Sequence, residues 1–264
     1  MSILIAFLVI AILGLLLGFG LAIADKKLAV EKDEKLIALE AIMPNANCGG
    51  CGYPGCSGYA AAVADGTAKI GLCSPGGAAL TAKMAEIMGV KVTAPTEKMV
   101  AFVFCDGSDE VTKKEFNYKG ITDCNAASLL HSGFNVCKEG CLHLGSCISV
   151  CPVSAISKDE NGKIVVDKEK CIGCKKCTTV CPNGVIKMLP YSAEYVVPCN
   201  NHEMGAKVKK ACQVGCIGCK ICQVKFPESG CVVENFLSHI EYDKVGKDIE
   251  DAMAACPQKC IKKR

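Results

Sequence analysis

Four cysteines fall between residues 171 and 181, in the stretch CIGCKKCTTVCP, and a proline follows the last of them. The spacing is CxxCxxCxxxCP, and the cysteines are Cys171, Cys174, Cys177 and Cys181. Structural zinc sites usually pair two CxxC turns across a longer loop. This compact run is instead typical of a loop that binds one iron–sulfur cluster and sends its fourth cysteine to another. This part of the chain is therefore expected to fold around two clusters.

The composition favours a fold organised by cofactors rather than by one large core. The chain has 264 residues, 22 cysteines, no tryptophan and only 5% aromatic residues, so few bulky side chains are present for packing. Disulfides, zinc and iron–sulfur clusters are the three explanations for this many cysteines. The formal net charge is +3, with acidic residues interspersed among basic ones, which argues against a nucleic-acid-binding protein.

Residues 3–24 form an apolar segment, ILIAFLVIAILGLLLGFGLAIA, without a charged residue. A helix of this length can cross the hydrocarbon core of a bilayer, which is about 30 Å thick. Lysines follow the segment at Lys26 and Lys27 and none precedes it, so the positive-inside rule predicts a single-pass membrane anchor with the cluster domains on the cytoplasmic side. A cleaved signal peptide is the alternative. Structural disulfides are rare in the reducing cytoplasm, which leaves metal binding for the cysteines.

A second cysteine pattern lies upstream of the run, as the exchange of ligands between two clusters requires. It consists of Cys137, Cys141, Cys147 and Cys151. Exchange predicts one cluster on Cys151, Cys171, Cys174 and Cys177, and a second cluster on Cys137, Cys141, Cys147 and Cys181. Residues 161–170 between the patterns read as a turn and a short strand. Leu144 stands where the middle ligand of the upstream loop would be, so Cys137 has to reach in from outside that loop.

The C-terminal region repeats the pattern, because residues 212–227, CQVGCIGCKICQVKFP, align with residues 137–152, CKEGCLHLGSCISVCP. One set of cluster ligands is replaced as a whole, by Phe226, Val245, Asp248 and Asp251. The other set is complete and predicts one cluster on Cys216, Cys219, Cys222 and Cys256, with Cys212 as a reserve ligand. The alternative is a scaffold that no longer binds a cluster.

A fourth site is predicted near the N-terminal segment, on Cys48, Cys51, Cys56 and Cys73. Glycines between these cysteines allow backbone amides to approach the cluster sulfurs, and residues 60–64 read as a short helix leading to the last ligand. Zinc is the alternative cofactor here. The total is four [4Fe–4S] clusters. Five cysteines have no place in these sites and are expected to be buried, inert thiols: Cys105, Cys124, Cys199, Cys231 and Cys260.

No catalytic residue is predicted, since the chain has no dinucleotide or Walker motif and no nucleophile arrangement apart from the clustered cysteines. The expected chemistry is electron transfer between clusters. Two classes of function agree with it. One is an electron-relay subunit of a membrane oxidoreductase, and the other is a membrane-anchored redox sensor or cluster carrier.

The order of these features resembles the B subunit of the Rnf ion-translocating electron-transport complex over nearly the whole chain. The resemblance is carried by the apolar segment, by CGGCGYPGC with its distant Cys73, and by the ferredoxin-type runs that follow, such as GCIGCKICQ. It implies a subunit of a redox-driven ion translocase, a ferredoxin:NAD+ oxidoreductase. Such a subunit takes electrons from soluble reduced ferredoxin and passes them to the other subunits of the complex at the membrane, with NAD+ as the eventual acceptor.

The expected architecture is one N-terminal transmembrane α-helix followed by small α+β iron–sulfur modules. The expected boundaries are 1–25 for the anchor, 26–35 for a linker, 36–92 for a four-cysteine [4Fe–4S] domain, 93–190 for a two-cluster ferredoxin-like domain and 191–264 for a degenerate one-cluster ferredoxin-like domain.

Overall fold

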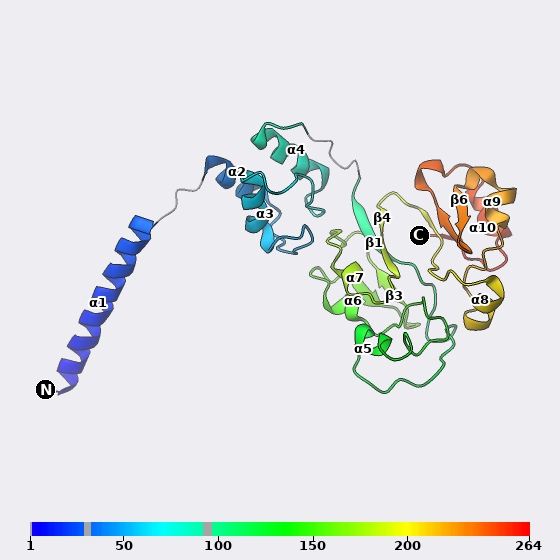
Figure 1. Ribbon diagram of the computed structural model, residues 1–264, viewed down its shortest axis with the longest axis horizontal. Coiled ribbons are helices and arrows are strands. Elements are labelled where there is room, and N and C mark those ends of the chain that lie inside the picture. The colour runs from blue at the N-terminus through cyan, green and yellow to red at the C-terminus, as the bar shows by residue number, and fades with distance from the viewer. Residues whose placement is uncertain (1, 29–32, 92–96) are drawn as a thin grey trace.

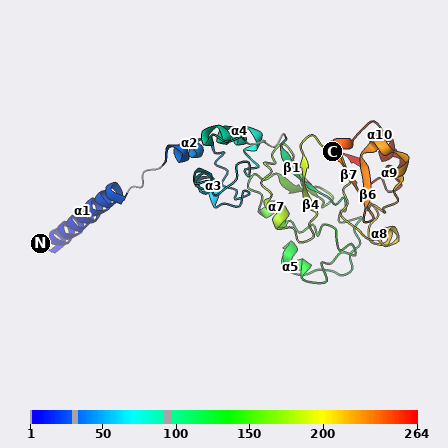
Figure 2. The ribbon, with the colours of Figure 1, turned by 45° about the horizontal axis from the view of Figure 1, so that its top comes forward.

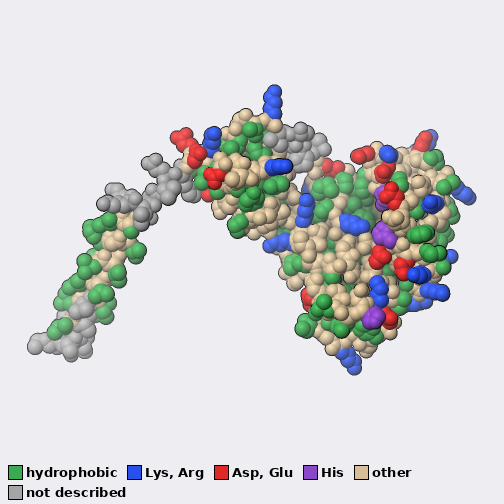
Figure 3. Space-filling view, in the orientation of Figure 1, with side chains coloured by type: hydrophobic (Ala, Val, Ile, Leu, Met, Phe, Trp, Pro, Cys, Tyr) green, Lys and Arg blue, Asp and Glu red, His purple; other side chains and the backbone are tan. Residues whose placement is uncertain are grey.

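Helix α1 (Ser2–Leu28) and three small modules follow one another along the long axis of the molecule (Figure 1, Figure 2). The computed structural model describes residues 2–28, 33–91 and 97–264. Hydrophobic side chains cover much of α1, whereas both signs of charge are spread over the modules (Figure 3). Within the described residues, no helix has both the length and the apolar character required to cross a membrane. The anchor expected over residues 1–25 stays a prediction.

Two predicted boundaries fall at residues that the structure does not describe. The expected linker over 26–35 includes residues 29–32, which lie outside the described residues, while α1 continues through Leu28. The boundary expected after residue 92 also lies outside them, because residues 92–96 are not described.

The first module is entirely helical and packs around a small apolar core. Its helices are α2 (Glu34–Ile42), α3 (Gly55–Ala64) and α4 (Gly77–Met88). Leu39 from α2, Tyr59 from α3 and Met84 from α4 are all almost completely buried against one another. The Tyr59 hydroxyl donates a 2.8 Å hydrogen bond to the Lys69 carbonyl oxygen and accepts one of 3.2 Å from the Leu72 N–H, so it positions the segment before Cys73. The short helix predicted at residues 60–64 is confirmed as part of α3.

The second module combines two short antiparallel sheets with three helical turns. The strands are β1 (Met99–Val103), β2 (Ile156–Lys158), β3 (Ile164–Val166) and β4 (Ile186–Pro190), and the helices are α5 (Cys124–Ser128), α6 (Ser146–Ser149) and α7 (Lys176–Thr179). Strand β1 pairs with β4 and β2 with β3. The turn and strand predicted at residues 161–170 are confirmed, with the strand at β3. Apolar residues of all four strands and several cysteines share one core.

The third module repeats this plan, as the internal repeat predicted. Its elements are β5 (Tyr195–Val196), α8 (Gly205–Ala211), α9 (Ile221–Lys225), η1 (Pro227–Ser229), β6 (Cys231–Glu234), β7 (Leu237–Ile240), η2 (Tyr242–Lys244), α10 (Ile249–Ala255) and β8 (Lys262–Lys263). Strand β5 pairs with β8 and β6 with β7, the order seen in the second module. Phe226 and Val245, at two positions of the missing ligands, pack against the core. The small α+β character expected for both ferredoxin-like regions is confirmed.

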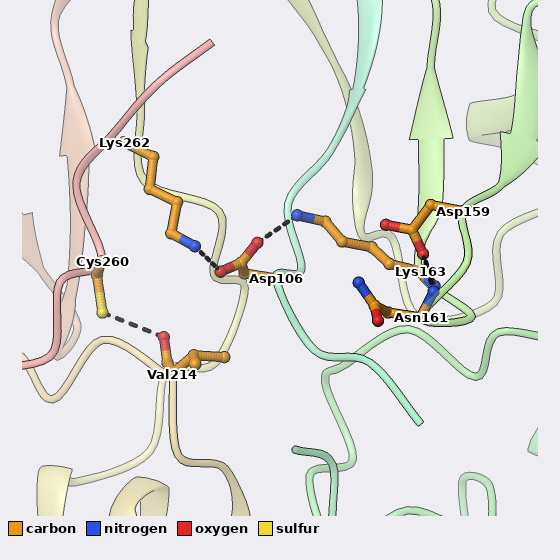
Figure 4. A network of polar contacts seen from close by, with 7 residues as sticks. All are labelled: Asp106, Asp159, Asn161, Lys163, Val214, Cys260 and Lys262. Carbon is orange, nitrogen blue, oxygen red and sulfur yellow. Dashed lines mark hydrogen bonds and ion pairs between the residues drawn. The ribbon is translucent and has the colours of Figure 1, made fainter. Parts of the chain in front are cut away.

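A buried carboxylate joins the second and third modules. Asp106, whose side chain is 7% exposed, forms ion pairs with Lys163 of the second module and Lys262 of the third (Figure 4). The Asp106 N–H also donates a 3.0 Å hydrogen bond to the Pro198 carbonyl oxygen. Because a buried carboxylate is costly without partners, these contacts hold the two modules in one arrangement.

Candidate iron–sulfur centres

Cavity A lies in the first module and has a volume of about 320 Å³. All four cysteines predicted for this module line it: Cys48, Cys51, Cys56 and Cys73. Asn47 Oδ1 accepts a 2.8 Å hydrogen bond from the Cys56 N–H, which shapes the loop that carries three of these thiols. A Cβ atom on Gly55, whose φ is +90°, would lie 3.0 Å from that Oδ1. Only glycine suits both this backbone conformation and this close approach.

Cavity B, of about 330 Å³, lies in the second module. It is lined by the cysteines that the ligand exchange groups together: Cys151, Cys171, Cys174 and Cys177. The N–H of Ala155 is directed at Cys151 Sγ at 3.3 Å, and the N–H of Ala101 is directed at Cys171 Sγ at 3.4 Å. Burial raises the pKa of Cys177 to about 12, and neighbouring thiols add to the rise. Without iron these thiols therefore stay protonated, and iron binding has to displace their protons.

Cavity C, of about 380 Å³, is the other cysteine-lined cavity of the second module. Its thiols come from separate turns and are those of Cys124, Cys141, Cys147 and Cys181. The last three are predicted ligands, but the structure does not bring the fourth, Cys137, into this cavity. Cys137 lies in a different cavity, together with Cys105 and Cys212. The geometry therefore replaces Cys137 by Cys124, a thiol that the sequence analysis took for inert.

Helix α5 delivers Cys124 to cavity C. Asp123 caps this helix by accepting a 2.8 Å hydrogen bond from the Ala126 N–H, and its other oxygen accepts one of 2.8 Å from the Ser146 hydroxyl. The same Ser146 Oγ accepts a 2.7 Å bond from the Cys124 N–H, so Cys124 is tied to the residue beside Cys147. The sequence carries only a weak signal for this ligand, an Asp–Cys pair at a helix start.

Cavity E lies in the third module, has a volume of about 380 Å³ and is lined by all four cysteines predicted there: Cys216, Cys219, Cys222 and Cys256. The reserve ligand Cys212 does not line it. The Cys260 N–H is directed at Cys256 Sγ at 3.3 Å, as the Ala155 N–H is at Cys151 in cavity B. The Cys260 thiol beside it lowers the pKa of Cys256 to about 5, which favours the thiolate form that binds iron.

Cavities A and B lie against each other at the contact of the first and second modules. A Cβ atom on Gly50, between two cysteines of cavity A, would collide with the carbonyl oxygen of Cys174 in cavity B. A Cβ atom on Gly173 would lie 3.7 Å from Ser74 Cβ. Backbone therefore meets backbone here without intervening side chains. Cavities B and C are also neighbours, because Cys147 is among the charges that raise the pKa of Cys177.

The donor sets of these cavities suit [4Fe–4S] clusters. Cysteine thiolates hold such clusters, and hydrogen bonds to the sulfurs and burial tune their potentials. Cavities A, B and C each offer four thiols, and cavity E offers five, because Cys260 lines it beside the four predicted ligands. Backbone N–H groups approach ligand sulfurs in B and E. Among the described residues, no group of three or more Cys, His, Asp or Glu side chains is placed to hold a single metal ion.

Fold and cavities together define an iron–sulfur electron-transfer protein built from a four-cysteine module and two ferredoxin-type modules. The FeS family model, which describes an Fe-S cluster domain, matches residues 43–75, and the 4Fe-4S dicluster domain model matches residues 135–188. These two matches cover cavity A and most of the ligands of cavities B and C. They confirm iron–sulfur clusters as the cofactors.

Three curated proteins match almost the whole chain. The B subunit of the Na(+)-translocating ferredoxin:NAD(+) oxidoreductase complex of Acetobacterium woodii is 38% identical over 96% of this chain and 75% of its own length. The B subunit of the proton-translocating ferredoxin:NAD(+) oxidoreductase complex of Clostridium ljungdahlii is 39% identical over 96% of this chain and 90% of its own length. The B subunit of the ion-translocating oxidoreductase complex of Methanosarcina acetivorans is 36% identical over 97% of this chain and 96% of its own length. The chain belongs to this family, the B subunits of Rnf complexes, as the sequence resemblance indicated.

Proposed function

We propose that this chain is the electron-relay subunit of a membrane-bound, ion-translocating oxidoreductase. It accepts electrons from reduced ferredoxin and passes them through its clusters to partner subunits at the membrane, with NAD+ as the eventual acceptor. The names of the relatives from Acetobacterium woodii and Clostridium ljungdahlii contain both ferredoxin and NAD(+). The observation that carries the proposal is the direct backbone contact between cavities A and B at Gly50 and Cys174, because a relay needs redox centres in close succession.

The proposed ligands follow the cavities. Cavity A would use Cys48, Cys51, Cys56 and Cys73. Cavity B would use Cys151, Cys171, Cys174 and Cys177. Cavity C would use Cys124, Cys141, Cys147 and Cys181. Cavity E would use Cys216, Cys219, Cys222 and Cys256. When bound, [4Fe–4S] clusters supply reversible one-electron chemistry over a wide range of potentials.

The protein's own contribution is to bury the ligands and to direct N–H groups at sulfur. Cys171 and Cys177 are both less than a tenth exposed, so water is largely excluded from cavity B. The N–H groups of Ala101 and Ala155 reach the sulfurs of Cys171 and Cys151. Such donors stabilise the negative charge that develops on reduction, which raises the tendency of the site to accept an electron.

The same proposal includes the membrane anchor. Residues 3–24 carry no charge and Lys26 and Lys27 follow them, which supports α1 as a single-pass helix with the modules on the cytoplasmic side. The proposed units are the anchor, a short linker, and domains at about 36–92, 93–190 and 191–264, consistent with the three separate cores around Tyr59, Ile164 and Ile240.

Anaerobic stopped-flow mixing of the full chain in detergent with chemically reduced ferredoxin tests the proposal. We expect the visible absorbance of the clusters to bleach rapidly after mixing, even when less than one ferredoxin is added per cluster. Iron content is measured on the same sample. A fully iron-loaded protein that takes up no electrons from ferredoxin would contradict the relay function and favour the redox sensor or cluster carrier.

A further inference from the structure

A fifth cysteine-lined cavity, cavity D, lies where the second and third modules meet. Four thiols line it, and cavities A, B, C and E use none of them: Cys105, Cys137, Cys199 and Cys212. All four are free thiols rather than disulfides. We propose that these four cysteines bind a fifth [4Fe–4S] cluster at the module contact.

The internal repeat explains why four thiols meet here. Cys105 follows strand β1 and Cys199 follows strand β5, which occupy the same place in the second and third modules. The N–H of Cys141 is directed at Cys105 Sγ at 3.3 Å, and the N–H of Cys216 is directed at Cys199 Sγ at 3.4 Å. Each module therefore holds one of these cysteines by the same bond to the first cysteine of its own cluster loop.

The other two cysteines are equivalent in the same way. Cys137 stands four residues before Cys141, and Cys212 stands four residues before Cys216. Each module thus contributes an equivalent pair of thiols, and the cavity has four ligands only when the modules are in contact. Two equivalent pairs of thiols from a repeated module form a specific arrangement, whereas four unrelated thiols have no reason to meet in one cavity.

The walls of cavity D leave room at the sulfurs. A Cβ atom on Gly140 would lie 3.3 Å from Cys137 Sγ, and one on Gly107 would lie 3.3 Å from Cys105 Sγ. The buried side chain of Asn201, from the third module, donates a 3.2 Å hydrogen bond from its Nδ2 to Cys137 Sγ in the second. Glycines also lie beside the cysteines of cavities A and B, and N–H donors reach sulfur in cavities B and E, so these features suit a cluster here as well.

One of the two acidic side chains around cavity D is neutralised by ion pairs. Asp106 and Glu139 line it, and two carboxylates would oppose an anionic site if they were unpaired. Asp106 is paired with Lys163 and Lys262 (Figure 4), and Glu139 accepts a 3.2 Å hydrogen bond from the His202 N–H. A cluster held by four thiolates would therefore lie beside one neutralised carboxylate, that of Asp106, whereas the Glu139 carboxylate contributes to the raised pKa of Cys137.

Cavity D connects cavities C and E. Gly140 lines both C and D, and the two N–H···S bonds to Cys105 and Cys199 come from Cys141 of cavity C and Cys216 of cavity E. With clusters bound in both cavities, transfer of one electron from C to D would oxidise the first and reduce the second, with no proton or further reactant required. This role rests on the proposed function, whereas binding of the cluster does not.

Iron analysis and Mössbauer spectroscopy of the anaerobically purified full chain test the binding. We expect about 20 irons per chain, from five clusters of four irons each, rather than about 16. Cys105→Ala and Cys199→Ala should each remove about four irons, and the double variant should remove the same four rather than eight, since both thiols serve one cluster. Cys199→Ala combined with Cys219→Ala should remove about eight.

Cys231→Ser is the matched control, because Cys231 is buried and lines none of the five cavities, and serine keeps a hydrogen-bonding group beside Cys222. Its iron content should equal that of the wild type. About 16 irons in the wild type, with or without one zinc, would overturn the fifth cluster. Additive iron loss in the Cys105→Ala/Cys199→Ala variant would also overturn it. Either result leaves electron uptake from ferredoxin, and hence the proposed function, open to its own test.

Discussion

The second and third modules have the same strand pairing but differ in the composition of their cores. In the second module, cysteines of cavities B and C form a large part of the core. In the third module, the counterpart of cavity B is gone, and Phe226, Tyr242 and Val245 pack against the core instead. Cavity E, the counterpart of cavity C, remains. The comparison teaches that either a cluster or a set of apolar side chains can organise the same small fold. Replacement of one cluster by apolar side chains leaves the neighbouring cavity intact.

The largest difference between the two modules is expected in their stability after iron is removed. Anaerobic chelation after oxidation should reduce hydrogen-exchange protection of the β2–β3 hairpin by about 100-fold or more, because metal binding supplies folding free energy where the core is made of ligands. The β6–β7 hairpin, with its additional apolar core, should lose about tenfold or less. Exchange followed by mass spectrometry measures both hairpins in one sample. Equal loss in both hairpins would mean that the apolar side chains do not replace the missing cluster.

Three double variants distinguish Cys124 from Cys137 as the ligand of cavity C. Cys124→Ala/Cys181→Ala should lose about four irons, because both thiols serve one cluster, whereas Cys137→Ala/Cys181→Ala should lose about eight. Cys124→Ala/Cys137→Ala should also lose about eight. Iron content per chain is the measurement. Full iron content in Cys124→Ala, together with loss of only four irons from Cys137→Ala/Cys181→Ala, would restore Cys137 to cavity C and contradict the structure.

Phe226→Ala should destabilise the third module by about 2–3 kcal/mol, less than for a fully buried phenylalanine because Phe226 is only partly buried. Urea unfolding of the iron-loaded protein, followed by exchange of the β6–β7 hairpin, measures the change. Val224→Ala, in helix α9 just before Phe226, is the control, since Val224 is 73% exposed and should change stability by about 0.5 kcal/mol or less. Similar values for both variants would show that Phe226 does not fill a core position.

The smallest effect is expected at the surface of cavity B. Lys175 and Lys176 line this cavity and Lys175 is exposed, so they can attract an acidic ferredoxin over a distance. Replacement of both by Glu should slow electron uptake from ferredoxin by about 3–10-fold at low salt, and the difference should shrink at high salt. Lys209→Glu/Lys210→Glu, on exposed residues of α8, serves as the control with equal charge change. An equal slowing in both variants would place the docking site elsewhere.

The sequence predicts cluster sites well where the ligands are close together along the chain. Cavities A and E follow from local spacing, and cavity B follows from the exchange of Cys151, which the CxxCxxCxxxCP pattern implies. Cys124 is different, because sixteen residues separate it from Cys141. Hydrogen bonds of Asp123 and Ser146, and packing against Phe134 and Leu142, hold it at the cavity. No spacing rule covers such an insertion.

Cavity D cannot be predicted from the spacing of cysteines along the chain, for a different reason. Cys105 and Cys199 belong to different modules and meet only after both have folded and docked, which ion pairs of Asp106 help to fix. The sequence does contain a hint, since Cys137 and Cys212 are aligned in the internal repeat. An unused pair of equivalent cysteines in a repeat indicates a site between the repeats rather than within one.

The central claim is that the cysteine-lined cavities hold clusters in one continuous row, from A through B, C and D to E. Freeze-quench electron paramagnetic resonance of the full chain, reduced with ferredoxin, tests it most directly. Clusters in adjoining cavities should broaden one another's signals, and Cys105→Ala should sharpen the signal of cavity E while removing about one spin per chain. A spectrum that is a simple sum of separate, unbroadened clusters, unchanged in Cys105→Ala, would contradict the account.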